Sequence, residues 1–183
     1  MSTHDSSALL AVRSTAVVGL GVATGLMASY PLFSWPAMYS ADSPLDVKGR
    51  LNLFWHLYSQ GAKTMKALLP SLSALLAYAS FATREPASYL PATFIGRHRK
   101  AVLGTAAVLV LANLPYTIAL IMPTNNRLKA IKDAKTSGAG AEAATTDAEV
   151  NQLIRKRWMS LHFGRILLCG TAFLLSVAEL GTA

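Results

Sequence analysis

Four long apolar stretches, separated by polar connectors, dominate the pattern of this 183-residue chain. They run roughly over residues 9–30, 63–83, 101–122 and 158–178. Each has the roughly 20 mostly apolar residues that a membrane-spanning helix needs. Because a helix satisfies its own backbone in lipid, the pattern predicts an all-α fold. We expect an integral membrane four-helix bundle, with residues 1–183 as a single four-span domain and both termini on one side.

The segments around the second and third stretches carry local signals for helix ends. Ser43-Pro44-Leu45-Asp46 resembles a helix start, with Ser43 as the N-cap and Pro44 at the first helical position. The second helix therefore begins well before its apolar stretch. We expect connectors at 83–100 and 129–151, the latter with a flexible Ala-, Gly- and Thr-rich centre at 136–146.

Composition supports a membrane protein. The chain is 52% hydrophobic and only 14% charged, against about 25% charged residues in a soluble domain. The net charge is +8, but no nucleic-acid motif accompanies it, so we expect no nucleic-acid partner. Basic residues in the connectors suit a lipid bilayer as partner. The prediction is a multi-pass protein of an internal membrane.

Two weaker signals concern orientation and assembly. The termini and the 83–100 connector hold five Lys and Arg residues, whereas the other two connectors with their helix mouths hold eleven. The positive-inside rule then places the termini away from the cytosol. Gly21 and Gly25 form a small-xxx-small pair, which permits a homo-oligomer, although chance in a glycine-rich span explains it equally well.

The last apolar stretch carries a polar stripe. At about 100° per residue, five side chains fall within an arc of roughly 60°: Trp158, His162, Arg165, Cys169 and Ser176. Lipid cannot satisfy such a stripe, so it is expected to face the bundle interior. The alternatives are a snorkelling Arg165, a structural hydrogen bond from His162 and an interfacial Trp158.

A second polar group follows the third apolar stretch. Asn125, Asn126 and Arg127 come directly after an uncharged run from Ala101 to Met122, at the same side of the membrane as the start of the last span. We expect this group to lie close to Trp158, His162 and Arg165. The alternative is a helix C-cap, because Asn tolerates the left-handed conformation that ends helices.

Metal and cofactor motifs are weak. The histidines, His4, His56, His98 and His162, show no metal-ligand spacing. A haem or metal held between His56 and His162 remains an alternative. The sequence has no dinucleotide fingerprint, P-loop or nucleophile elbow.

Two elements together resemble the anthrone oxygenase family. The first is Met122-Pro123-Thr124-Asn125-Asn126-Arg127-Leu128 at the end of a span. The second is Trp158-x3-His162-x2-Arg165 at the start of the last span. Tyr30-Pro31 and the aromatic segment with Phe54, Trp55, Tyr58 and Gly61 extend the resemblance to most of the chain, although Tyr30 replaces a small residue.

The resemblance implies a monooxygenase of secondary metabolism, which oxidises a lipophilic anthrone-type polyketide to an anthraquinone with molecular oxygen and no established cofactor. His162 is then the expected base. Arg165 and Arg127 would stabilise an anionic oxygen, Asn125 and Asn126 would orient the substrate oxygens, and a ring-binding wall would comprise Trp158, Trp55 and Tyr58.

Two other classes of function compete with an oxygenase. A non-catalytic four-span scaffold or interaction protein would use its polar residues only for helix packing. A small transporter would need a continuous polar path, yet no Asp or Glu occurs in 6–30, 61–83 or 101–122, which argues against a cation pathway.

Overall fold

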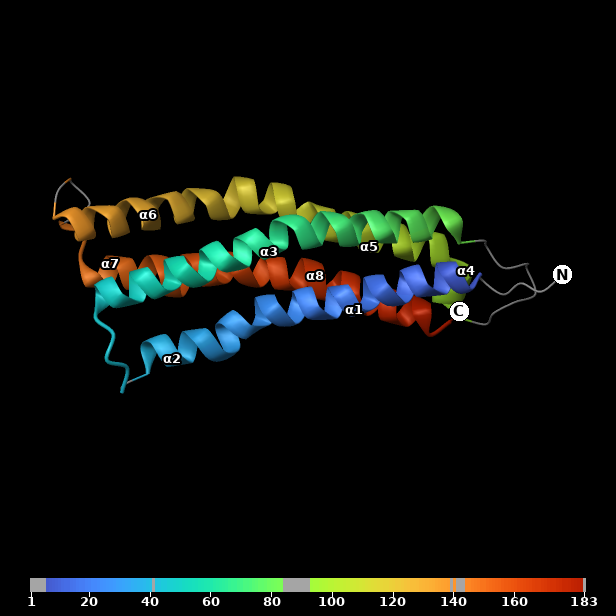
Figure 1. Ribbon diagram of the computed structural model, residues 1–183, viewed down its shortest axis with the longest axis horizontal. Coiled ribbons are helices and arrows are strands. Elements are labelled where there is room, and N and C mark those ends of the chain that lie inside the picture. The colour runs from blue at the N-terminus through green and yellow to red at the C-terminus, as the bar shows by residue number, and fades with distance from the viewer. Residues whose placement is uncertain (1–5, 41, 84–92, 139, 141–143, 183) are drawn as a thin grey trace. The chain divides into compact units, whose positions relative to one another are not determined.

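The computed structural model describes residues 6–40, 42–83, 93–138, 140 and 144–182, and within them the chain is helical, without strands. Figure 1 follows the elements in chain order. In the labels, η marks a π-helical turn. The elements are α1 (Ser7–Ser29), η1 (Tyr30–Ser34), α2 (Trp35–Tyr39), α3 (Val47–Ala82), α4 (Phe94–Arg97), α5 (Arg99–Tyr116), η2 (Thr117–Ile121), α6 (Met122–Ser137), α7 (Asp147–Gln152), η4 (Leu153–Trp158) and α8 (Met159–Leu180).

Four continuous helical runs are long and apolar enough to cross a membrane: Ser7–Tyr39, Val47–Ala82, Arg99–Ser137 and Asp147–Leu180. They confirm the predicted all-α fold with four membrane helices, and hence a multi-pass membrane protein. Each run has at least 33 residues, well beyond the roughly 20 that span a bilayer core. The helices therefore continue past the apolar stretches that identify them in the sequence.

The prediction that residues 129–151 form a connector is wrong for most of its described part, which is helical. Helix α6 continues to Ser137 and ends in the left-handed residue Gly138, and α7 begins at Asp147. Ile131 and Ala134 are buried one turn apart, and a capping box between Thr146 and Glu149 starts α7. Burial of an apolar helix face therefore outweighs the polar composition. The expected connector at 84–92 and residues 139 and 141–143 of the expected flexible centre lie outside the described residues.

The start of α3 is also corrected. The helix begins at Val47, not near Pro44. Asp46 is its cap, because its Oδ1 accepts a 2.7 Å hydrogen bond from the Gly49 backbone N–H. Ser43 instead belongs to a turn, in which its backbone N–H donates to the Ser40 carbonyl oxygen at 3.1 Å. A carboxylate at a helix N-terminus also interacts favourably with the helix dipole.

Prolines accompany two of the π-helical turns. Pro31 lies within η1, and η2 lies between Pro115 and Pro123. Proline has no backbone N–H, so the α-helical ladder is already interrupted at these points, and a wider turn is accommodated there. Consequently, the first and third membrane helices do not end at Tyr30 and Met122, where the apolar stretches end. They continue beyond the prolines as helix.

Contacts between Cα atoms divide the chain into two compact units, each containing parts of all four long helices. Unit 1 consists of the described residues of Met1–Gly25, Met65–Asn113 and Leu167–Ala183, and unit 2 consists of those of Leu26–Thr64 and Leu114–Ile166. The three π-helical turns of the described chain all lie in unit 2. Such turns occur frequently at functional sites.

Unit 1 has a core of small and branched residues and a buried ion triad. Arg13 donates to both carboxylate oxygens of Glu179, from Nε at 2.9 Å and from Nη2 at 2.6 Å. Arg99 donates from Nε to the same carboxylate at 2.9 Å. Arg13 lies near the start of α1, Arg99 at the start of α5 and Glu179 near the end of α8. The triad therefore holds these three helix ends together. The five basic residues counted for the side of the termini include Arg13 and Arg99. Because both are buried in the triad, they do not report the orientation in the membrane.

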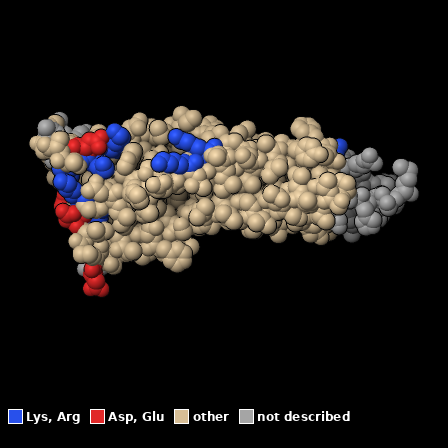
Figure 2. Space-filling model, viewed as in Figure 1, with Lys and Arg blue, Asp and Glu red and all other residues tan. Residues whose placement is uncertain are grey.

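Four of the five residues in the polar stripe of the last helix are buried, as predicted: Trp158, His162, Cys169 and Ser176. The fifth, Arg165, is half-buried. Phe163, Leu167, Leu174 and Val177, on other faces of α8, are exposed, as expected for contact with lipid. On the face drawn in Figure 2, most charged side chains gather near the end at which α6 and α7 are labelled in Figure 1.

Candidate functional site

Trp158 is the centre of a buried aromatic cluster in unit 2. Its ring stacks on His162, with centroids 4.6 Å apart and an interplanar angle of 12°. Tyr30 and Phe54 approach the same indole at 4.8 and 5.0 Å. We call Tyr30, Phe54, Asn125, Trp158 and His162 the Trp158 cluster. Edge-to-face and stacked contacts of this kind hold aromatic rings in defined orientations.

Asn125 is fixed by Trp158. The indole Nε1–H donates to Asn125 Oδ1 at 2.9 Å, and Asn125 is only 1% exposed. Because an indole N–H can only donate, this bond assigns Oδ1 and Nδ2 of the amide. The alternative in which Asn125 and Asn126 cap a helix is wrong: both lie inside α6, and Gly138 occupies the C-cap.

His162 is fixed by the first membrane helix. Its Nε2 lies 2.9 Å from the Met27 carbonyl oxygen, and the side chain is 5% exposed. A carbonyl oxygen only accepts, so Nε2 carries the proton. The neutral ring then has its lone pair on Nδ1, which has no hydrogen-bond partner among the described residues. The arrangement presents a base in a defined tautomer.

Two other polar atoms of the cluster share that feature. Tyr30 Oη and Asn125 Nδ2 make no hydrogen bond among the described residues, and Thr124 Oγ1, in the residue before Asn125, is among the further buried atoms of unit 2 without one. Burying an unsatisfied polar group costs about 1–3 kcal/mol, so natural proteins contain few of them. Tyr30 Oη, Asn125 Nδ2 and His162 Nδ1 are therefore the polar atoms of the Trp158 cluster that the described residues leave unsatisfied.

The remaining predicted aromatic and basic residues occupy the edge of this region. Tyr58 stacks on Phe54 with centroids 6.3 Å apart, and its hydroxyl donates to Met122 Sδ at 3.8 Å. Trp55 contacts Tyr58 at 5.4 Å and is half-buried. Arg165 follows His162 by three residues on α8 and is half-buried. Their predicted roles stay predictions.

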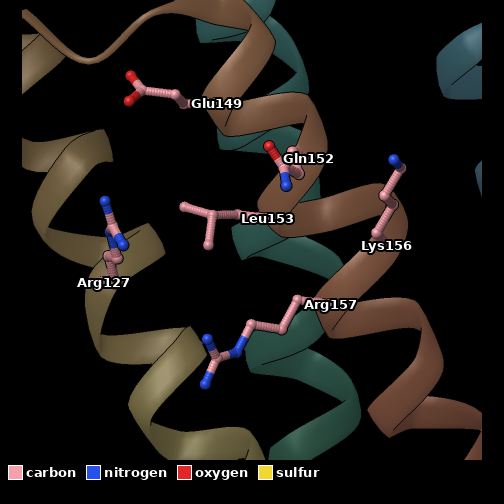
Figure 3. Close-up of a pocket in the computed structure, with 6 residues that line it drawn as sticks. All are labelled: Arg127, Glu149, Gln152, Leu153, Lys156 and Arg157. Atoms are coloured by element: carbon pink, nitrogen blue, oxygen red, sulfur yellow. The ribbon is translucent and has the colours of Figure 1, made fainter.

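Asn126 and Arg127 point elsewhere. Both are exposed on α6, because successive helical residues lie about 100° apart. Arg127 lines a pocket of about 540 Å³ together with Glu149, Gln152, Leu153, Lys156 and Arg157. Figure 3 shows this pocket between α6 and the α7–η4 segment. The tertiary structure thus separates the sequence motif into a buried Asn125 and an outward-facing Arg127.

Two residues of the cluster were not among the predicted site residues, and neither was Thr124. Tyr30 looked like the closing residue of the first span, and Phe54 like one member of an aromatic segment. The available signal for Tyr30 was its position directly before Pro31, where a helical irregularity is expected. For Thr124 the signal was its place in the polar motif itself.

The predicted histidine pair divides between two environments. His56 is exposed on α3, whereas His162 is buried. Within the described residues, no three His, Cys, Asp or Glu side chains come together in a group that would hold a metal ion. Cys169, the one cysteine of the sequence, is buried.

Comparison with known proteins supports the family resemblance that the sequence motifs indicate. The family model described as anthrone oxygenase matches residues 54–175, which include Asn125, Trp158 and His162 and extend over most of the chain. The chain belongs to the anthrone oxygenase family.

A curated protein with a similar sequence carries the same family name. The anthrone oxygenase ptaC of Pestalotiopsis fici is 30% identical over 78 residues, which are 43% of this chain and 54% of that protein. The chain thus spans about half the length of this curated relative. No solved structure matches the chain.

Proposed function

We propose that this protein is a membrane-bound oxygenase that converts an anthrone-type polyketide to an anthraquinone with molecular oxygen, in secondary metabolism. Family membership supports the substrate class. The observation that carries the proposal is His162, a buried base whose Nε2–H is held by the Met27 carbonyl oxygen while Nδ1 has no partner among the described residues. Asn125 Nδ2, a donor in the same condition, belongs to the same cluster.

The first step is a proton transfer. The methylene group of an anthrone lies between two aryl rings, and loss of its proton gives an aromatic anthrolate with its charge on the ketone oxygen. His162 Nδ1 would take this proton. Asn125 Nδ2 and the Tyr30 hydroxyl would donate to the developing oxyanion, where fixed donors stabilise charge most effectively.

The oxidation then balances without a further reductant. The anthrolate passes an electron to oxygen, a C–O bond forms at the former methylene carbon, and a proton completes a hydroperoxide. Removal of the remaining C–H proton forms the second carbonyl, breaks the O–O bond and expels hydroxide, which takes up the removed proton and leaves as water. One oxygen atom enters the quinone and the other leaves as water. His162 would return the first proton to the peroxide, then remove the second and pass it to the hydroxide.

The surrounding residues would bind and orient the ring system. Trp158 and Phe54 provide flat apolar surfaces, which suit a fused aromatic substrate. Tyr58 and the partly exposed Met122 form an outer edge through a weak sulfur contact. We propose this edge as the entry from the bilayer of an internal membrane. Arg165, one turn beyond His162, would add positive charge near the anion.

Oxygen consumption by the purified protein, with an anthrone as substrate, tests the proposal. His162→Ala is expected to lower turnover by about 10²–10⁴-fold, because it removes the base. Asn125→Ala should lower it by at least about tenfold, because it removes an oxyanion donor. The matched control is His98→Ala, which replaces an exposed histidine of unit 1 and should leave turnover unchanged.

Several outcomes would contradict this function. A wild-type protein that consumes no oxygen with any anthrone would exclude it and favour the scaffold alternative. Full turnover in both folded variants would exclude the Trp158 cluster as the site. A Soret band or stoichiometric metal, lost in both His56→Ala and His162→Ala, would replace the mechanism with one that uses a bound cofactor.

A further inference from the structure

The pocket beside Arg127 is a candidate site that the oxygenase mechanism does not use. Its basic lining residues are Arg127 on α6 and Lys156 and Arg157 on η4, and its acidic one is Glu149 on α7. A volume of about 540 Å³ lies within the range of small-molecule sites. We call these residues, with Gln152 and Leu153, the cationic pocket.

The pocket lining carries more positive than negative charge: its basic side chains are Arg127, Lys156 and Arg157, and its one carboxylate is Glu149. Glu149 Oε2 accepts from the Thr146 backbone N–H at 2.9 Å and from the Thr146 hydroxyl at 3.0 Å, and its charge attracts Arg127 without balancing the other two cations. Among the described residues, no carboxylate lies within 4.0 Å of the cationic groups of Arg127, Lys156 or Arg157. Like charges around one hollow repel one another unless an anion occupies it.

The geometry suits a ligand with several equivalent oxygens. In Figure 3 the side chains of Leu153 and Arg157 extend from η4 toward α6, where Arg127 faces Leu153. Guanidinium groups offer paired N–H donors that match phosphate oxygens. Lys156 extends away from α6 in Figure 3 and adds only to the local positive charge. Gln152 adds a neutral amide, and Leu153 provides an apolar floor.

The position along the helices places this pocket at the polar end of unit 2. Arg127 directly follows the uncharged run 101–126, and Arg157 directly precedes the last apolar stretch. Side chains at this point of a span meet the headgroup layer and the adjoining water. A phosphate group is available there from two sources, an anionic lipid and the aqueous phase.

We propose that the cationic pocket binds a phosphate group through Arg127 and Arg157. This inference is independent of the oxygenase proposal, since neither residue belongs to the Trp158 cluster. Occupancy would link α6 to the α7–η4 segment and thereby stabilise unit 2.

Binding is measured with the full-length protein in phosphatidylcholine nanodiscs at constant ionic strength. One arm adds phosphatidic acid to the nanodiscs, and the other adds inorganic phosphate to the buffer. The readout is the melting temperature as a function of probe concentration. Arg127→Gln/Arg157→Gln is compared with Lys129→Gln/Lys132→Gln, a control that removes equal charge from α6 without altering the pocket lining.

The pocket variant is expected to weaken binding by at least about tenfold, because it removes two charge-assisted contacts. The control variant should weaken it by less than about threefold, through long-range attraction alone. A response to phosphatidic acid alone identifies a lipid site, and a response to inorganic phosphate identifies a soluble-ligand site. Equal weakening in both variants, or no response of the wild-type protein in either arm, would overturn the proposal.

Discussion

In unit 1 the buried ionic groups bond one another and the buried side-chain atoms without a described partner include the hydroxyls of Thr24 and Thr83, whereas in unit 2 they include an imidazole nitrogen, an amide nitrogen and a phenol. Glu179, which is 0% exposed, accepts from two arginines in unit 1. In unit 2 the side-chain atoms Nδ1 of His162, Nδ2 of Asn125 and Oη of Tyr30 make no described hydrogen bond. A fully paired network gives a rigid scaffold, and an incompletely paired one leaves groups available to a ligand.

The cores of the two units also differ in the size of the residues that they pack. Unit 1 packs small residues closely, including Ala16, Ala23, Ala79 and Ala106, as membrane helices do when their backbones approach. Unit 2 packs large aromatic rings around Trp158 and contains the π-helical turns. Under the proposed function, unit 1 holds the helices together and unit 2 carries the chemistry. Three changes test the division.

The largest expected effect on stability is that of Glu179→Gln. The change keeps the side-chain volume but leaves Arg13 and Arg99 buried without the carboxylate that pairs them. Loss of one partner from a buried ion pair costs about 3–5 kcal/mol. Unfolding in a denaturing detergent should show this loss, while turnover per folded molecule is retained because the Trp158 cluster is unaltered.

Asp133→Asn is the control for that experiment. Asp133 pairs with Lys129 on an exposed surface, where an ion pair contributes about 0–1 kcal/mol. Similar destabilisation by the two variants would contradict a scaffold role for the triad.

A smaller loss is expected for Gly164→Ala in unit 2. A Cβ atom at Gly164 would lie 2.7 Å from Tyr116 Cζ, and Tyr116 Oη donates to the Leu161 carbonyl oxygen at 3.1 Å. Overpacking of this kind costs about 1–3 kcal/mol. Thermal unfolding of the purified protein measures it, and removal of the hydroxyl in Gly164→Ala/Tyr116→Phe should restore part of the loss.

Gly25→Ala provides the comparison in unit 1. A Cβ atom there meets no heavy atom within 4 Å, so the change should be neutral or stabilise by up to about 1 kcal/mol. Equal losses at the two glycines would show that helix flexibility, and not the contact with Tyr116, determines the effect.

Tyr30→Phe should cost no stability and therefore separates stability from function. The change removes a buried hydroxyl that no described residue bonds, so the free energy of unfolding should not fall and should rise by up to about 1–3 kcal/mol. Oxygen consumption with an anthrone should fall by about tenfold, since one donor to the oxyanion is lost. Tyr78→Phe, at an exposed tyrosine of α3, should change neither quantity. Full turnover of the Tyr30 variant would remove Tyr30 from the proposed site.

Sequence patterns predicted the helices better than their ends. Apolar runs identify spans because lipid requires them, whereas the continuation of α6 to Ser137 depends on burial of Leu128, Ile131 and Ala134 in unit 2. The sequence predicted Ser43 as the N-cap of α3, whereas the backbone enters the helix three residues later, at Asp46. The ion triad was not expected, because an acid near the end of the last span and an arginine in the first do not indicate each other.

By itself the sequence determined the four membrane helices, the buried polar stripe on the last one and the family. Helical periodicity and the chemistry of lipid are local rules, so they can be read along the chain. Tertiary structure alone decided which polar groups meet. Asn125 and Trp158 are 33 residues apart, His162 and Met27 are 135 apart, and Arg13 and Glu179 are 166 apart. Such pairs form only when the helices pack, and they determine which buried atoms remain for a ligand.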